Sequence, residues 1–146
     1  MKNSFLKAKG FTLIELVVVL VIVAIMAAAA VPKFIGLQTD ARISVIQGVE
    51  GALRSAATLV YSKSLIDGIE QDATGTVSVI TGSVAVVYGY PAASATGIDA
   101  AIDISSDIVP SATRTFTLRT NCYVIYNAAT SASAPATVSA PVTTGC

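Results

Sequence analysis

An unbroken apolar run near the start of the chain restricts its possible folds more than any other feature. The run extends from Phe11 to Val31, and only Thr12 and Glu15 interrupt it with polar side chains. As a helix, its roughly 21 residues at about 1.5 Å each would span the roughly 30 Å hydrocarbon core of a bilayer. We therefore expect a helix that lies in lipid or packs against other apolar helices.

A secretory signal peptide would account for the same run. Residues 1–10 are basic and could serve as its n-region, residues 16–26 as its apolar h-region and residues 27–30 as its Ala-x-Ala cleavage site. Glu15 argues against this interpretation, because a carboxylate inside an apolar segment costs several kcal/mol and a signal peptide gains nothing from it. We expect instead that Glu15 has a function in a helix that is retained.

The junction between the basic segment and the apolar run carries a specific motif. Residues 9–15 read Lys-Gly-Phe-Thr-Leu-Ile-Glu, and this stretch resembles the cleavage and N-methylation signature of type IV pilins and of type II secretion pseudopilins. The resemblance implies that a membrane aspartyl peptidase cuts between Gly10 and Phe11 and methylates the new N-terminus at Phe11. Residues 1–10 would then be a leader peptide, and the apolar helix would remain in the mature protein.

Glu15 could fix the register between neighbouring helices. After cleavage, Phe11 would carry a positive amine one helical turn before Glu15. In a bundle of such helices, Glu15 of one subunit could pair with the Phe11 amine of its neighbour, whereas apolar contacts alone would let the helices slide. The pilin resemblance implies the same role. The simpler alternative is that Glu15 only neutralises its own N-terminus.

The composition excludes several classes of function. The chain contains no histidine, so serine-histidine and cysteine-histidine catalysis are excluded and the commonest nitrogen ligand for metals is missing. Its formal net charge is zero, its basic residues are scattered, and it has no glycine-rich phosphate loop. We therefore expect a protein that is not an enzyme, holds no cofactor or metal, and does not bind nucleic acid.

The sequence after the apolar run predicts one globular domain, residues 32–146. Pro32 and Gly36 predict a kink or local weakening of the helix, after which a helical pattern continues to about Ser64. Its apolar residues recur at spacings of three and four along one face, and they are Ile46, Val49, Leu53, Ala56 and Val60. Glu50 and Arg54 form an i,i+4 pair on another face.

Two β-hairpins are predicted beyond this helix, in a mostly antiparallel sheet. The first joins residues 76–80 to residues 83–88, and the second joins residues 115–118 to residues 122–126. Between them, residues 97–106 predict a short helix.

Three aspartates, Asp99, Asp103 and Asp107, recur at every fourth position of this stretch. Such spacing suggests either a calcium site or a solvated acidic helix face. We favour the solvated face, because no glycine-containing ligand loop accompanies the aspartates.

The C-terminal segment has an unusual composition. Residues 128–145 are almost entirely Ala, Ser, Thr and Pro without a charge, which cannot build a core. Cys122 and Cys146 favour a disulfide that would hold this segment, since an even cysteine count behind an export-type N-terminus is typical of an oxidising compartment. Two free buried thiols are the alternative. Pilins carry a C-terminal disulfide loop of this kind, exposed on the filament.

The predicted fold is therefore α+β, of the type IV pilin kind. One long N-terminal helix packs by its C-terminal half on a mostly antiparallel sheet, and a disulfide loop follows at the C-terminus. Residues 1–10 would be a cleaved leader, residues 11–31 a transmembrane and assembly helix, and residues 32–146 a globular domain that is first periplasmic and then exposed on the surface.

Three short stretches resemble the mannose-sensitive haemagglutinin pilins, a branch of the type IVa class. They are residues 32–34, 59–63 and 88–91. The resemblance implies a structural pilus subunit for surface attachment, with motility as a further use. It places the subunit in the inner membrane before assembly and in an extracellular pilus afterwards. The implied partners are copies of itself, a prepilin peptidase and methyltransferase, an inner-membrane assembly platform with its ATPases, an outer-membrane secretin and surface glycans.

Two other functions fit parts of the sequence. A type II secretion pseudopilin shares the N-terminal motif, but the cysteine pair and the Ser/Thr-rich C-terminal loop suit a long exposed fibre better. A membrane-anchored periplasmic binding module is a further alternative, which the lack of histidine and of other site-forming residues disfavours.

Overall fold

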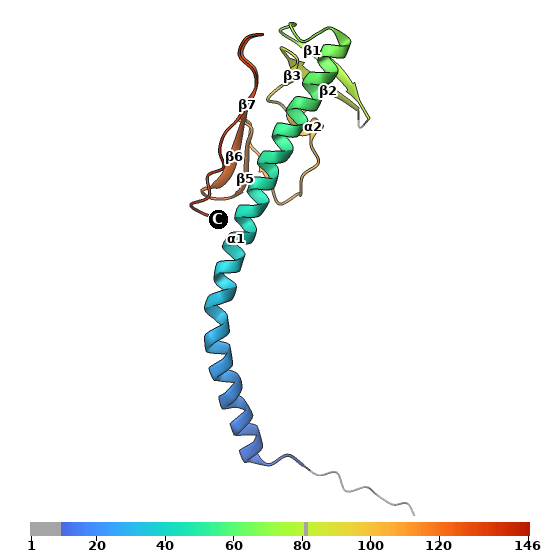
Figure 1. Ribbon diagram of the computed structural model, residues 1–146. Helices are drawn as coiled ribbons and strands as arrows, with labels where there is room; N and C mark the ends of the chain where they lie inside the picture. The colour runs from blue at the N-terminus through green and yellow to red at the C-terminus, as the bar shows by residue number, and fades with distance from the viewer. Residues whose placement is uncertain (1–9, 81) are drawn as a thin grey trace, which may run out of the picture. The chain divides into compact units, whose positions relative to one another are not determined.

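The structure, a computed structural model, describes residues 10–80 and 82–146. The expected leader, apart from Gly10, lies outside the described residues, and of residues 33–35 only the backbone is described. The chain divides into two compact units, residues 1–38 and residues 39–146. Helix α1 (Leu13–Asp67) passes through both units, and all other elements belong to the second (Figure 1).

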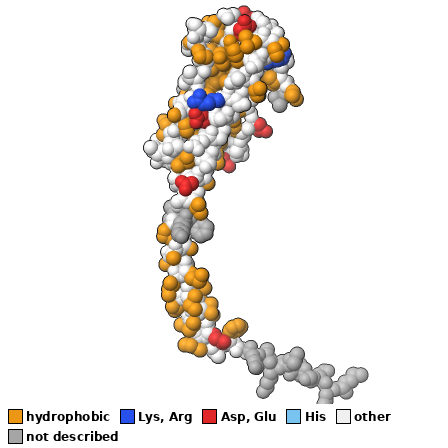
Figure 2. Space-filling model, in the orientation of Figure 1, with side chains coloured by type: hydrophobic (Ala, Val, Ile, Leu, Met, Phe, Trp, Pro, Cys, Tyr) orange, Lys and Arg blue, Asp and Glu red, His pale blue; other side chains and the backbone are white. Residues whose placement is uncertain are grey.

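The part of α1 in the first unit has no protein cover. Every side chain from Phe11 to Ala29 is exposed, and Figure 2 shows hydrophobic side chains along the visible face of this part of the helix. Helix α1 is the one described helix whose length and composition would let it cross a membrane. A signal sequence would meet the same two criteria. Apolar side chains in this number require lipid or other apolar helices around them.

The part of α1 in the second unit is amphipathic, as the sequence predicted. All five residues of the expected apolar face are buried: Ile46, Val49, Leu53, Ala56 and Val60. Residues spaced by three and four lie on one face of a helix, so this stripe packs on the strands while the other faces meet solvent. The helix ends at Asp67, and Gly68 follows with φ of 70°, a left-handed conformation that glycine adopts readily.

The strands form two antiparallel sheets instead of the single sheet expected. The first contains β1 (Gly75–Val79), β2 (Gly82–Val87) and β3 (Tyr90–Pro91) in that order. The second contains β4 (Val109–Pro110), β5 (Thr115–Arg119), β6 (Cys122–Asn127) and β7 (Thr137–Val138). Figure 1 shows the first sheet near the end of α1 and β5–β7 further back along the same helix.

Each sheet has its own buried cluster against α1. Val77, Val84 and Val86 of the first sheet pack with Val60 of the helix. The larger cluster joins the helix to the second sheet through Phe116, Val124 and Tyr126, among others. The Tyr126 hydroxyl donates a buried hydrogen bond of 2.7 Å to the carbonyl oxygen of Pro91, which ties β6 to β3. The two sheets therefore share one helix, and in the described part of the chain this hydrogen bond links them directly.

Helix α2 (Ile98–Ala101) is shorter than the predicted helix over residues 97–106. Ile102 already has extended backbone angles, φ −126° and ψ 150°. The residues that follow are rich in Ser and Asp, whose side chains compete for backbone hydrogen bonds and favour turns. Ile98, the anchor of the short helix, is fully buried.

Candidate assembly site

The N-terminus of α1 is closed by a capping box between Thr12 and Glu15. The Glu15 carboxylate oxygen Oε2 accepts hydrogen bonds from the Thr12 backbone N–H at 3.0 Å and from the Thr12 hydroxyl at 2.9 Å. The Glu15 N–H in turn donates to Thr12 Oγ1 at 3.3 Å. A Ser or Thr at the N-cap and a Glu three residues later satisfy two helix-end donors reciprocally. This role of Thr12 was not predicted from the sequence, although the Thr-x-x-Glu spacing is its signal.

This geometry keeps one Glu15 oxygen available. Oε2 makes both capping contacts, whereas Oε1 accepts no hydrogen bond from the residues that the structure describes. Phe11, whose amine would become the N-terminus after cleavage, is 91% exposed. The side chain can therefore hold its own helix end and still receive a cation from another chain. The register role of Glu15 and the cleavage at Gly10–Phe11 themselves stay predictions.

The expected kink site lies within continuous helix. Pro32 is part of α1, and the helical hydrogen-bonding pattern runs through Gly36. A Cβ atom added to Gly36 would meet no described atom within 4 Å, so the described residues make no packing contact there that requires glycine. A proline inside a helix still removes one backbone hydrogen bond. The weakening of the helix at these two residues stays a prediction.

A disulfide joins Cys122 to Cys146, as expected. The two residues are 24 positions apart in sequence, their Cα atoms are 5.0 Å apart, and both are buried. Arg42 of α1 donates a hydrogen bond of 2.9 Å from Nη1 to the Cys146 carbonyl oxygen. The bridge thus fixes the C-terminal segment to β6, and Arg42 fixes it to the helix.

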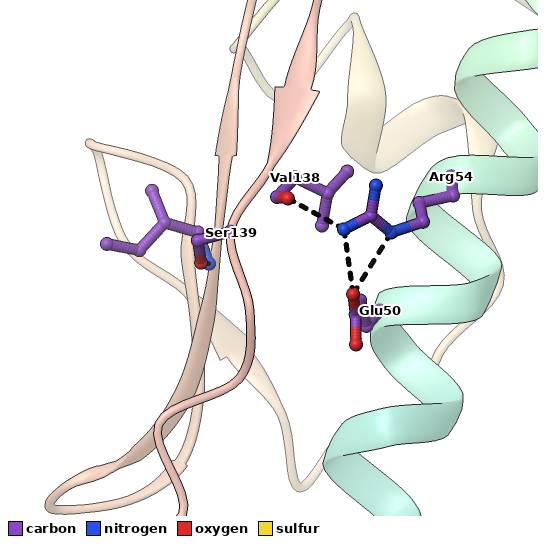
Figure 3. A network of polar contacts seen from close by, with 5 residues as sticks. Glu50, Arg54, Val138 and Ser139 are labelled. Carbon is purple, nitrogen blue, oxygen red and sulfur yellow. Dashed lines mark hydrogen bonds and ion pairs between the residues drawn. The ribbon is translucent and has the colours of Figure 1, made fainter.

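Backbone pairing holds the C-terminal segment as well. Strand β7 pairs with β6 through Val138 and Tyr126, and Val142 exchanges two backbone hydrogen bonds with Tyr123, at 3.1 and 2.8 Å. Figure 3 shows a further contact, in which Arg54 of α1 donates to the Val138 carbonyl oxygen at 3.0 Å. The same arginine binds Glu50 at 2.8 Å, which confirms the i,i+4 pair.

The three aspartates do not share a helix face. Asp99 lies in α2, which ends before the other two, and it forms an ion pair of 3.0 Å with Arg114. Burial raises the pKa of the Asp99 carboxyl, and the Arg114 guanidinium opposes this rise. Asp103 and Asp107 are exposed. Within the described residues, no cluster of three or more acidic or cysteine side chains is placed to hold a metal ion.

Comparison with known proteins supports the motif in this N-terminal region. The family described as the prokaryotic N-terminal methylation motif matches residues 6–31. The type IV narrow pilus major component PilA5 of Thermus thermophilus is 47% identical over 51 residues, which are 35% of this chain and 44% of that protein. The type IV major fimbrial protein FimA of Dichelobacter nodosus is 30% identical over 99 residues, 58% of this chain and 64% of that protein. Over the matched residues, the chain is similar to these type IV pilus proteins.

The chain spans less than two thirds of the length of either protein. No solved structure matches it at a significant level. The expected α+β pilin architecture is nevertheless confirmed by the long N-terminal helix, the antiparallel sheets and the disulfide. Neither relative is named as a mannose-sensitive haemagglutinin pilin, so that finer resemblance stays a prediction.

Proposed function

We propose that this chain is a structural subunit of a type IV pilus and polymerises through the N-terminal part of α1. The observation that carries the proposal is the run of exposed apolar side chains from Phe11 to Ala29, with one carboxylate at its N-terminal end. The methylation motif over residues 6–31 and the two pilus proteins among its relatives support it. Both relatives are named as major pilus or fimbrial components, which supports a structural role over an enzymatic one.

Assembly uses the free oxygen of Glu15. Apolar contacts between the helices supply most of the attraction but specify no register, since they are non-directional. A Phe11 amine from the neighbouring subunit meets Oε1 while Oε2 stays in the capping box. In a bundle without water, every other alignment leaves a charge unpaired, at a cost of about 3–5 kcal/mol. Many alignments of the helices give similar apolar contact, and the charge pair therefore selects one of them.

The subunit follows the route of a prepilin. A prepilin peptidase cuts between Gly10 and Phe11 and methylates Phe11, and the mature chain waits in the inner membrane with residues 11–31 in the bilayer. An assembly platform with its ATPases moves subunits into the filament, which leaves through an outer-membrane secretin. The globular domain, residues 32–146, then lies on the filament surface, where it mediates attachment to surfaces and their glycans.

Sheared surface filaments, analysed by mass spectrometry, test the proposal. The extracellular chain should begin at N-methylated Phe11, because the peptidase leaves the apolar helix attached. An N-terminus at Val31 or nearby would establish the signal-peptide interpretation and contradict ours. A short fibre confined to the periplasm, with no chain in the sheared fraction, would instead favour a type II secretion pseudopilin.

A further inference from the structure

Strand β1 has a free edge on the side away from β2. In the order β1-β2-β3 of the described strands, it has a neighbouring strand on one side alone. Thr76 of β1 lies opposite Ala85 of β2. The Ala85 N–H donates to Thr96 O and the Ala85 carbonyl oxygen accepts from the Ala92 N–H, both at 2.8 Å. Thr76 and Ala85 are thus a non-hydrogen-bonded pair, and the backbone groups of Thr76 point outward from the sheet.

Ser78 has the same orientation, because hydrogen-bonded and non-hydrogen-bonded pairs alternate along an antiparallel ladder. Among the described residues, no hydrogen bond reaches the outward N–H or C=O of Thr76 or Ser78. Such an edge is a template for a strand from another chain, and proteins usually block it with proline, charge or a bulge. Strand β1 has no proline and no charged residue, and its register with β2 is regular.

An apolar groove of about 480 Å³ lies between this edge and α1. Its lining includes Ala56, Leu59 and Val60 of the helix, Val79 and Ile80 at the end of β1, and Ala101 of α2. Leu59 is 69% exposed there, and Ile80 is fully exposed. Side chains alternate along a strand, so those on the inner face of an added strand would enter this groove. The edge and the groove together meet the requirements of β-strand addition.

The surface around the edge is neutral. Residues 73–98, which include the whole first sheet, contain no charged side chain. Lys63, the charged residue of the groove, is paired with Asp67 at 2.6 Å. Two copies of this surface can therefore approach each other without like-charge repulsion. The edge is also complementary to itself, because outward N–H and C=O groups alternate along it and match those of an antiparallel copy.

We propose that β1 pairs with β1 of a second copy of this chain, antiparallel, with Thr76 opposite Ser78 of the partner subunit. The two sheets then form one continuous sheet, and the groove beside Val79 of each copy lies next to Gly75 of the partner subunit. Both copies use the same surface, so the contact is two-fold symmetric and joins two copies without continuing a filament. This β1 contact rests on the proposed function, because neighbouring filaments would bring many copies of the chain close together.

Mixed cysteine cross-linking tests the register. The mature full-length chain with Thr76→Cys is mixed in detergent with the chain carrying Ser78→Cys, oxidised with copper phenanthroline and run on a non-reducing gel. Directly opposite residues in a hydrogen-bonded pair have Cα atoms about 5.5 Å apart, which a disulfide can bridge. The mixture should give several-fold more covalent dimer than either variant alone. Equal yields in all three samples, or no dimer, would overturn the proposal.

Ser78→Pro tests the edge itself, with Ser78→Ala as the matched control. Proline removes the outward N–H without removing a bond to β2, so the fold should persist, and equal thermal unfolding of both variants checks this. Ser78→Pro should weaken dimer formation about tenfold, and its filaments should lie singly in electron micrographs. Filament yield after shearing should equal that of Ser78→Ala, which separates this contact from helix assembly. Equal dimerisation of the two variants would contradict the proposed pairing.

Discussion

Glu15 uses its two carboxylate oxygens differently. Oε2 is held by the backbone N–H and the hydroxyl of Thr12, so the carboxylate is oriented before any neighbour arrives. Preorganisation of this kind lowers the entropy lost when a second charge binds. Thr12 therefore acts on the start of the helix, whereas Glu15 acts on both the helix start and the proposed contact between subunits. Substitutions at these two residues should separate the two effects.

Thr12→Val should loosen the first turn of α1 without preventing assembly. The substitution removes the capping hydroxyl at a cost of about 1 kcal/mol, which corresponds to roughly fivefold faster amide exchange in that turn. Hydrogen exchange of the mature chain in detergent measures this effect. Thr12→Ser keeps the hydroxyl and should exchange like the parent. Filaments should still form in Thr12→Val, because Glu15 keeps its charge. Parental exchange rates in Thr12→Val would show that the capping box is unimportant.

At the scale of elements, local patterns were predictable and long-range pairings were not. The spacing of Ile46, Val49 and Leu53 identified the buried face of α1, because helical periodicity is written in consecutive residues. The division of the strands into two sheets depends on contacts such as Tyr126 with Pro91, which are 35 positions apart and leave no local pattern. The sequence likewise gave no sign that Arg42 and Arg54 hold the C-terminal segment.

The C-terminal segment shows the limit of arguing from composition. Its Ala, Ser and Thr residues indicated a segment without a core that the disulfide must hold. The disulfide is present, but β7 also pairs with β6, and Ala129 is buried. Backbone hydrogen bonds do not depend on side-chain size, so small residues can complete a sheet that larger ones have begun. Composition predicted the bridge and underestimated the pairing.

Cys146→Ser should destabilise this segment far more than Arg54→Met. Loss of the bridge should cost roughly 3–4 kcal/mol, as expected for a loop of this length. Loss of the arginine, whose side chain is 56% exposed, should cost at most about 1 kcal/mol. Limited proteolysis of the mature chain in detergent should cut residues 128–146 rapidly in Cys146→Ser and slowly in Arg54→Met. Equal protection of both variants would mean that β-pairing alone holds the segment.

The whole molecule combines two units with different requirements. Residues 39–146 bury their own core, whereas the described part of residues 1–38 exposes its apolar side chains and needs partners. The sequence predicts a boundary after residue 31, where the apolar run ends, and that boundary stays a prediction. The proposed function assigns the apolar helix to contacts along a filament, and our further proposal assigns the β1 edge to contacts between filaments. The two contacts involve different residues, so each can be removed separately.

Filament formation by Glu15→Leu tests the central claim most directly. The variant should insert into the inner membrane at least as well as the parent, because an apolar side chain replaces a carboxylate. It should still be cleaved after Gly10, since the residues flanking the cut are unchanged, and N-terminal analysis of the membrane fraction checks this. Sheared filaments should nevertheless be absent when it is the sole subunit, because no carboxylate meets the Phe11 amine and many registers become equivalent. Filaments of normal yield and length from Glu15→Leu alone would contradict the charge-register account.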